Sequence, residues 1–191
     1  MKKVAGIFLV VFAIISCRKD ESDVTFSLPN ITQTGAQTFG FLLNTSTVWV
    51  NHGQYCDAYG TCRDNLAGTY YSGDGGITLR ADRVIYMDGV AHVDTFELTL
   101  QTNLGEPRTY DTSAGDYMTV SYFPAEDRVV GYKLPGSGAL FQVTIAKLDA
   151  ATHVLSGEFT GTLFRKLTTG GATSTTDSIR LTSGRFDVKF P

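Results

Sequence analysis

Residues 77–102 read ITLRADRVIYMDGVAHVDTFELTLQT, and this stretch decides the fold. In its second half, apolar Phe96, Leu98 and Leu100 alternate with polar residues. A period of two buries one face of a strand and leaves the other face in water. Asp88-Gly89 stands between the halves and signals a tight hairpin, because glycine tolerates the positive φ that such a turn requires. The stretch therefore predicts two long antiparallel strands in a half-exposed sheet.

The same alternation of apolar and polar residues continues through the rest of the chain. Short runs of period two are separated by turn residues such as Asn44-Thr45-Ser46 and the cluster at residues 135–138. We expect strands at residues 41–43, 48–50, 77–87, 93–102, 117–123, 129–134, 140–148, 154–164 and 179–190, a β-bulge at Ser183-Gly184 and a polar loop at 168–178. The prediction is an all-β domain, an antiparallel β-sandwich or flattened barrel of about ten strands spanning residues 39–191.

The composition agrees with one folded β domain. The 191 residues are 42% hydrophobic and 18% charged and include 20 glycines. This balance suits a glycine-punctuated β protein better than a helical bundle. The formal net charge is -3, and no run of lysine or arginine is longer than two residues. The chain therefore lacks the basic stripe that nucleic-acid binding needs.

The first residues have the pattern of a bacterial lipoprotein signal peptide. Lys2-Lys3 precede the uncharged run Val4–Ile15, which at 12 residues suits a secretory signal and is too short to span a bilayer. The run ends in Ile14-Ile15-Ser16-Cys17, which resembles the lipobox. The resemblance implies that residues 1–16 are removed and that Cys17 becomes a lipid-modified N-terminus, anchored in a membrane by its acyl chains.

The residues that follow suggest where the lipoprotein goes. The sequence Cys17-Arg-Lys19-Asp20-Glu21 resembles the Cys-x-Lys-acidic-acidic signal that sends Bacteroidetes lipoproteins to the outer face of the outer membrane. A generic charged tether at the periplasmic face is the alternative. Residues 17–38 are then the lipidated N-terminus and a polar tether.

The other two cysteines favour a disulfide. With Cys17 assigned to lipid, Cys56 and Cys62 remain, and Gly60 gives the loop between them the backbone freedom that a small ring needs. A zinc site is the alternative, but none of the three histidines lies at ligand spacing from a second one. We expect a Cys56–Cys62 disulfide and no metal or other cofactor.

Two blocks of the sequence carry a family resemblance: residues 28–40 near the start of the domain, and a C-terminal block that includes residues 156–159 and 184–188. Residues 28–40 read LPNITQTGAQTFG, residues 156–159 read SGEF, and residues 184–188 read GRFDV. Together they resemble a family of Bacteroidetes lipoproteins of unknown function, in which a cysteine often occupies the place of Phe41. The resemblance implies a fold and a location, and it implies no catalytic residues.

The motifs of common enzymes are missing from the sequence. There is no Gly-x-Ser-x-Gly elbow, and Gly73–Gly76 lacks the lysine of a phosphate loop. Glu97 and Glu158 fall at polar-face positions of strands, where nothing sets their separation. We therefore expect a protein that is not an enzyme.

One region has the residues of a binding surface. Aromatic rings and carboxylates on a disulfide-braced loop suit a sugar or a peptide, because rings stack at low entropic cost. The candidate ligand surface comprises Trp49, Tyr55, Asp57, Tyr59, Asp64, Tyr70, Tyr71 and Asp74. Burial of the tryptophan, with the tyrosines capping the end of the domain, is the alternative. The three aspartates fit Ca²⁺ by ligand type only, since no EF-hand spacing is present.

Together these patterns predict a membrane-anchored lipoprotein of the outer membrane, displayed on the cell exterior, whose β domain is a binding or structural module. A glycan- or peptide-binding accessory of a nutrient-uptake system is the first alternative. A metal-dependent hydrolase that uses the acidic loop is the second.

Overall fold

The computed structural model describes residues 26–56, 60–71, 76–87, 89–101, 108–125, 131–135, 140–166 and 173–191. Its strands are β1 (Thr38–Leu43), β2 (Thr47–Val50), β3 (Tyr55–Cys56), β4 (Cys62–Arg63), β5 (Leu66–Tyr71), β6 (Gly76–Met87), β7 (Val90–Leu100), β8 (Thr109–Asp111), β9 (Met118–Phe123), β10 (Tyr132–Lys133), β11 (Phe141–Asp149), β12 (Val154–Lys166) and β13 (Thr173–Lys189). One 3-10 turn, η2, covers Thr112–Ala114. The predicted all-β fold is confirmed.

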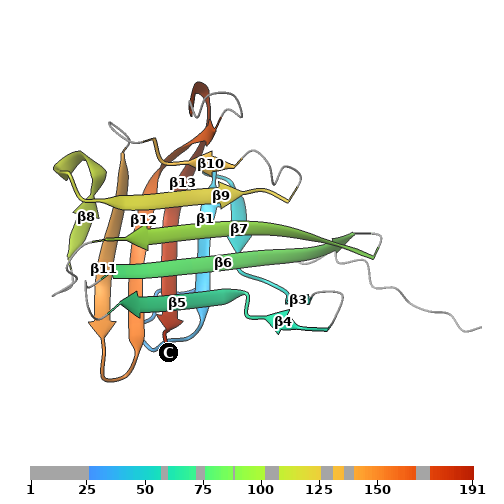
Figure 1. Ribbon diagram of the computed structural model, residues 1–191, viewed down its shortest axis with the longest axis horizontal. Coiled ribbons are helices and arrows are strands. Elements are labelled where there is room, and N and C mark those ends of the chain that lie inside the picture. Colours follow the sequence, from blue (N-terminus) through green and yellow to red (C-terminus); the bar gives the residue numbers. More distant parts are fainter. Residues whose placement is uncertain are drawn as a thin grey trace, which may run out of the picture.

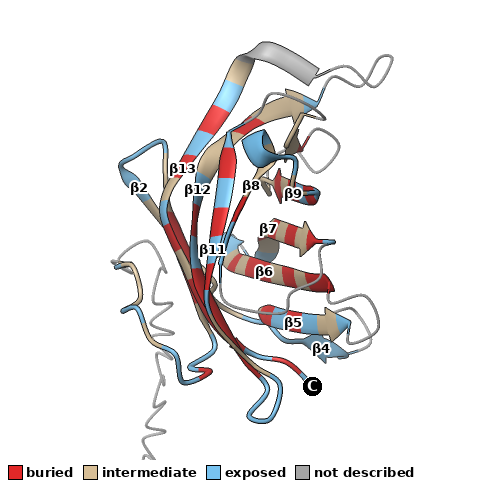
Figure 2. Ribbon diagram, turned by 90° about the vertical axis from the view of Figure 1, so that its left-hand side faces the viewer, coloured by how far each residue is buried: buried red, intermediate tan, exposed pale blue. Residues whose placement is uncertain are grey.

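Eleven of these strands form one curled antiparallel sheet, a half-barrel. The hydrogen-bonded order is β2-β1-β13-β12-β10-β9-β7-β6-β5, and β11 pairs with β12 and with β8. Strands β11, β12, β13 and β1 form one layer, and they cross the direction of β5, β6, β7 and β9 in the other layer (Figures 1 and 2). The short β10 joins the layers at a corner, because it pairs with both β9 and β12. The inward faces of the two layers share one core.

The chain that follows β2 ties the first strands to the opposite edge of the sheet. His52 forms a parallel bridge with Arg83 of β6. The backbone N–H of His52 donates to the carbonyl of Asp82 at 3.2 Å, and the N–H of Val84 donates to the carbonyl of His52 at 2.8 Å. The pairing of β5 with β6 ends at Ala81. The bonds from His52 therefore satisfy backbone N–H and C=O groups of β6 that β5 no longer reaches.

Aromatic rings fill the space between the layers. The ring of Phe39 lies 5.8 Å from Trp49, 5.0 Å from Phe96 and 5.4 Å from Phe159, measured between centroids. Phe41 stacks on Trp49 at 4.9 Å. All of these side chains are buried, so the interior of the half-barrel is a packed core.

Glycines on the inner face make room for the rings. A Cβ atom at Gly161 would lie 2.2 Å from Cδ2 of Phe141, and one at Gly184 would lie 2.5 Å from the ring of Phe159. Any larger residue would overlap a ring at these positions. A Cβ atom at Gly157 would likewise lie 2.7 Å from Cζ of Phe186. The "Ser-Gly-x-Phe" and "Gly-Arg-Phe" patterns, which contain Gly157 and Gly184, therefore have a packing explanation in this chain.

The central hairpin and the bulge are found where they were predicted. Met87 pairs with Val90, which leaves two residues for the turn between β6 and β7. The pairing of β12 with β13 shifts from Phe159↔Gly184 to Gly161↔Leu181, which places a bulge around Ser183.

One predicted boundary is wrong, and some strands were not predicted. The polar loop expected at 168–178 is strand from Thr173 onward, where Thr173 pairs with Lys166. Threonine is β-branched and suits a strand, so a threonine-rich segment is polar without being a loop. Strands β5 and β8 also lie where no strand was expected. Residues 126–130, which belong in part to the predicted strand at 129–134, lie outside the described residues.

The folded domain begins before residue 39, because the segment ahead of β1 is bound to the last strand. The carboxylate of Asp187, which is only 1% exposed, is the acceptor. Its donors are the hydroxyls of Thr32 (2.5 Å) and Thr34 (3.3 Å) and the backbone N–H groups of Thr34 (3.0 Å), Gly35 (2.7 Å) and Ala36 (3.2 Å). The expected tether is therefore part of the fold at these residues, and the two sequence blocks that carry the family resemblance meet here.

Candidate functional site

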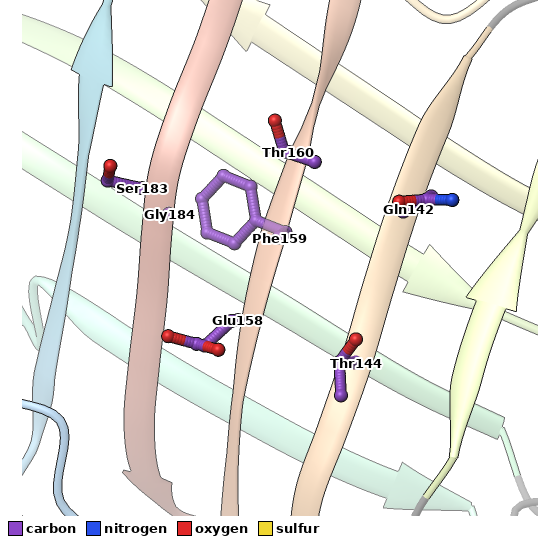
Figure 3. A pocket seen from close by; sticks show the side chains of 7 residues that line it. All are labelled: Gln142, Thr144, Glu158, Phe159, Thr160, Ser183 and Gly184. Atoms are coloured by element: carbon purple, nitrogen blue, oxygen red, sulfur yellow. The ribbon is translucent and has the colours of Figure 1, made fainter.

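Two adjoining hollows lie on the outer face of β11, β12 and β13, and Figure 3 shows the first of them. Gln142, Thr144, Glu158, Phe159, Thr160, Ser183 and Gly184 line the first. Leu140, Gln142, Thr160, Gly161, Thr162 and Arg180 line the second. Because the hollows share Gln142 and Thr160, we treat them as one site and call it the polar groove.

Strand alternation brings the polar side chains together. In β11, apolar residues at 141, 143 and 145 face the core, so Gln142 and Thr144 face outward. In β12, Glu158 and Thr160 face outward for the same reason. The register pairs Gln142 with Thr160 and Thr144 with Glu158, which sets these four side chains beside one another.

The β-bulge contributes the fifth polar residue. Leu181 and Phe186 are both buried, although strict alternation would put residues five apart on opposite faces. An extra residue between them restores the phase, and Ser183 takes that place with a φ of 51°. Its side chain is exposed at the wall of the polar groove, opposite Glu158 and Thr160 across the ring of Phe159 (Figure 3).

The segment bound by Asp187 borders the groove. We call residues 29–36 the strap. Arg185 of β13 donates from Nη1 to the carbonyl of Pro29 at 2.8 Å, and Lys147 of β11 donates from Nζ to the carbonyl of Gln33 at 3.2 Å. Arg185 is the register neighbour of Glu158. The strap therefore crosses the same sheet face next to the groove.

Neighbouring strands hold the side chains on the β11 side of the groove. The hydroxyls of Thr109 and Thr144 share a hydrogen bond of 2.9 Å. The amide of Gln142 donates to the carboxylate of Asp111, and this bond together with those from Ser113 lowers the pKa of Asp111. Asp111 thus stays ionised and remains an acceptor for Gln142 over the physiological pH range.

The groove can bind polar groups but offers little for catalysis. Hydroxyls and an amide make up most of its polar lining, with the carboxylate of Glu158 and the guanidinium of Arg180. Its lining residues include no second carboxylate and no histidine to form an acid–base pair. In the described part of the chain, no three histidine, cysteine, aspartate or glutamate side chains gather in a way that would hold a metal ion.

The described members of the ligand surface expected from the sequence do not lie on one surface. The prediction that Trp49 belongs to a surface is wrong, because this residue is fully buried and stacks on Phe41 in the core. Tyr70 is half-buried against Phe190, and Tyr71 is exposed at the end of β5. Asp64 is exposed just before the start of β5.

The remaining members of that surface lie elsewhere or are not described. Tyr55 belongs to β3, near the other end of β5 from the two tyrosines (Figure 1). Asp57, Tyr59 and Asp74 lie outside the described residues, as do Cys17, Lys19, Asp20 and Glu21.

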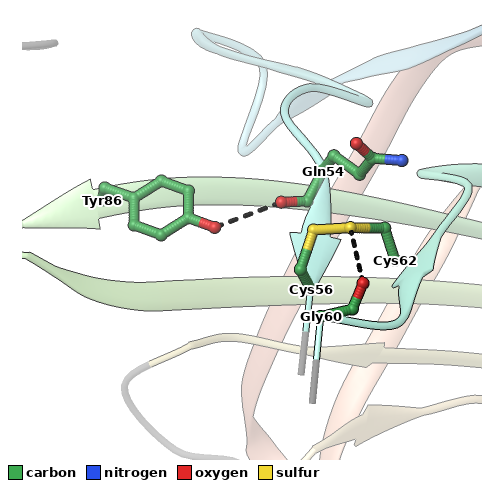
Figure 4. Close-up of a disulfide and its surroundings, with 5 residues drawn as sticks. All are labelled: Gln54, Cys56, Gly60, Cys62 and Tyr86. Carbon is green, nitrogen blue, oxygen red and sulfur yellow. Dashed lines mark hydrogen bonds between the residues drawn. A yellow bond between two sulfur atoms is a disulfide. The ribbon is translucent and has the colours of Figure 1, made fainter. Parts of the chain in front are cut away.

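The predicted Cys56–Cys62 disulfide is confirmed (Figure 4). It closes the small β3–β4 hairpin, and β4 carries Arg63 to the buried carboxylate of Asp82, with Nε 3.1 Å from Oδ2. The disulfide thus braces an ion pair between the hairpin and β6.

Two buried carboxylates were not expected from the sequence. Asp82 accepts a hydrogen bond from the hydroxyl of Thr95 at 2.7 Å. Asp94 accepts from Nε of Arg83 at 2.8 Å and from Nε1 of Trp49 at 3.1 Å. Asp94 lies two positions before Phe96 and therefore on the same inward face of β7. This spacing is the signal from which the sequence could have predicted that Asp94 is buried.

The Asp94 pair affects a neighbouring phenol. Burial raises the pKa of Tyr122, and the negative charge of Asp94 raises it further. Tyr122 is therefore neutral at physiological pH.

No protein-family model, no curated protein and no solved structure matches this chain. Among the described residues, no helix combines the length and the apolar character needed to cross a bilayer. The features of this chain that bear on function are therefore its sequence signals and the polar groove.

Proposed function

We propose that this protein is a lipid-anchored protein of the outer membrane, displayed on the cell exterior, whose half-barrel binds a hydroxyl-rich ligand of the oligosaccharide class without turnover. The polar groove carries the proposal. Five outward polar side chains of types that hydrogen-bond hydroxyl groups lie together on an exposed sheet face, and the interior of the half-barrel is filled.

The ligand chemistry follows from the groove's lining. Hydroxyls and amides both donate and accept, as sugar hydroxyls do, so one ligand group can satisfy several partners. With one carboxylate and one guanidinium, the lining has no excess charge to select an ionic ligand. An extended peptide would instead require an open strand edge for backbone pairing, whereas β12 and β13 are paired on both sides.

Calorimetric titration with soluble oligosaccharides and with peptides tests the binding function. The Gln142→Ala plus Glu158→Ala variant should lose oligosaccharide binding while its melting temperature stays near that of the parent, because both side chains are exposed. Glu97→Ala plus Thr99→Ala is the matched control on the outer side of β7. Binding that survives the groove variant, or that responds only to peptides, contradicts the proposal.

Mass spectrometry of the purified protein tests the anchor. The N-terminal peptide should begin at Cys17 and carry acyl chains, and Cys17→Ser should release the protein from membranes. Replacing Lys19, Asp20 and Glu21 with alanine should keep the lipid but remove the protein from the protease-accessible cell surface. An unmodified Cys17 would contradict the anchor, and unchanged display would contradict the export signal.

A further inference from the structure

The β6–β7 hairpin extends past the neighbouring strands (Figure 1). Exposed apolar residues lie at its end. Tyr86 is 45% exposed, Met87 48% and Val90 60%. We call these three residues the apolar tip. Tyrosine and small aliphatic or thioether side chains on one loop end are suited to the boundary between water and lipid, where an amphipathic ring satisfies both sides.

Neighbouring contacts hold the tip in place. The hydroxyl of Tyr86 donates to the carbonyl of Gln54 at 3.2 Å, and Gln54 leads directly into the disulfide-closed hairpin (Figure 4). Met87 and Val90 face each other in the β6–β7 register. The apolar groups are thus presented by paired backbone, so little further ordering would be needed on contact with another phase.

The chain from the proposed lipid reaches the domain at the same end. Phe26, the first described residue, packs its ring on His52 with a centroid distance of 5.0 Å. His52 is paired with Arg83, four positions before Met87 on β6, which is about 13 Å along a strand. Nine residue steps separate Cys17 from Phe26, so a lipid on Cys17 lies at most about 30 Å from Phe26.

From these placements we infer that the apolar tip is a second membrane contact, lying in the interfacial region of the bilayer that holds the lipid. The inference rests on the proposed lipid anchor at Cys17. The short connection keeps the tip near the bilayer, and burial of three apolar side chains then favours the orientation in which they touch it. The groove lies on the other layer of the half-barrel, so this orientation leaves its outer face in water.

Fluorescence quenching on the full-length lipidated protein in phosphatidylcholine vesicles tests the orientation. One variant carries an environment-sensitive fluorophore on Met87→Cys, attached under non-reducing conditions. The control carries it on Leu140→Cys, a site that is 70% exposed and directly precedes β11. Strand β11 lies on the opposite side of the molecule from the β6–β7 turn (Figure 1). We expect lipids spin-labelled near the headgroup to quench the label at 87, with a blue shift of its emission, and to leave the label at 140 unquenched.

Two further measurements separate the possible failures. Adding Val90→Ser to the Met87→Cys variant should reduce the quenching at 87. Flotation of the vesicles should carry the protein with them. A protein that floats while the labels at 87 and 140 are quenched equally overturns the tip contact and leaves the anchor standing. A protein that does not float overturns the anchor, and the tip contact with it.

Discussion

Replacement of Asp187 by alanine should release the strap and destabilise the whole domain. The carboxylate accepts hydrogen bonds from three backbone N–H groups and from the hydroxyls of Thr32 and Thr34, at 2.5 to 3.3 Å, and Asp187 is 1% exposed. Without it, these donors have no partner unless the strap leaves the sheet. Arg185 and Lys147 would then lose their acceptors in the strap as well.

The size of the effect follows from those donors. Leaving one buried donor without a partner costs about 1–3 kcal/mol, but the strap can detach and return its groups to water. Because detachment of the strap limits the summed cost of the unpaired donors, we expect a loss of about 3 kcal/mol in the free energy of unfolding. For a domain of this size that corresponds to a fall in melting temperature of about 6–12 °C.

Urea unfolding of residues 24–191 measures the loss, and Asp149→Ala is the control. Asp149 also accepts backbone N–H groups, from Ala151 and Thr152, but in an exposed turn. Its replacement should leave the free energy of unfolding nearly unchanged, because water can satisfy these groups. If both variants lose the same stability, the buried network does not hold the strap as we argue.

The contribution of Asp187 should also depend on pH. Burial alone would raise the pKa of Asp187, but the Thr32 hydroxyl and the strap N–H groups outweigh it and lower the pKa. A lowered pKa means that the stabilisation is present above the unfolded value of about 3.9 and is lost as the pH falls through the folded value. The stability difference between the parent and Asp187→Asn should therefore narrow below about pH 4 in urea titrations. A constant difference from pH 7 to pH 3 would contradict the assignment.

Three further predictions concern the core and the hairpin. Gly161→Ala should lower the free energy of unfolding by about 2 kcal/mol, because its Cβ would overlap a phenylalanine ring, and thermal unfolding would measure it. Reduction of Cys56–Cys62 should cost about 2 kcal/mol and leave the far-ultraviolet circular dichroism unchanged, since the ring is small and lies outside the main sheet. Arg83→Met should destabilise by about 3 kcal/mol in urea, because Asp94 stays buried without its cation, and Asp94→Leu in the same chain should recover part of the loss.

The sequence predicted the strands well where one face of a strand meets the core. The alternation of Phe96, Leu98 and Leu100 and the Asp88-Gly89 turn are local signals, and each depends on the pleat and on φ alone. The Ser183-Gly184 bulge was predicted just before the last run of alternating apolar residues, and the shift in the β12–β13 register lies there. The threonine-rich start of β13 was missed because its strand form depends on pairing with β12.

The candidate site was predicted less well, because it depends on which strands become neighbours. Glu158 was assigned to a polar face, but Gln142, Thr144, Thr160 and Ser183 form a groove with it only through the register of three strands. The ligand surface was predicted within residues 49–74 because aromatic residues are frequent there, but Trp49 is part of the core. Aromatic content identifies apolar area, and it does not show which side of a sheet receives that area.

By itself the sequence determined that this chain makes an antiparallel β domain with a disulfide-closed hairpin, because periodicity, turns and cysteine spacing act over a few residues. Only the tertiary structure decided that the strap belongs to the fold. Asp187 and its donors are more than 150 positions apart in the chain, and a hydrogen bond over that separation depends on the complete sheet between them. The complete sheet likewise decides that Phe26, the first described residue, lies at the same end of the domain as the apolar tip.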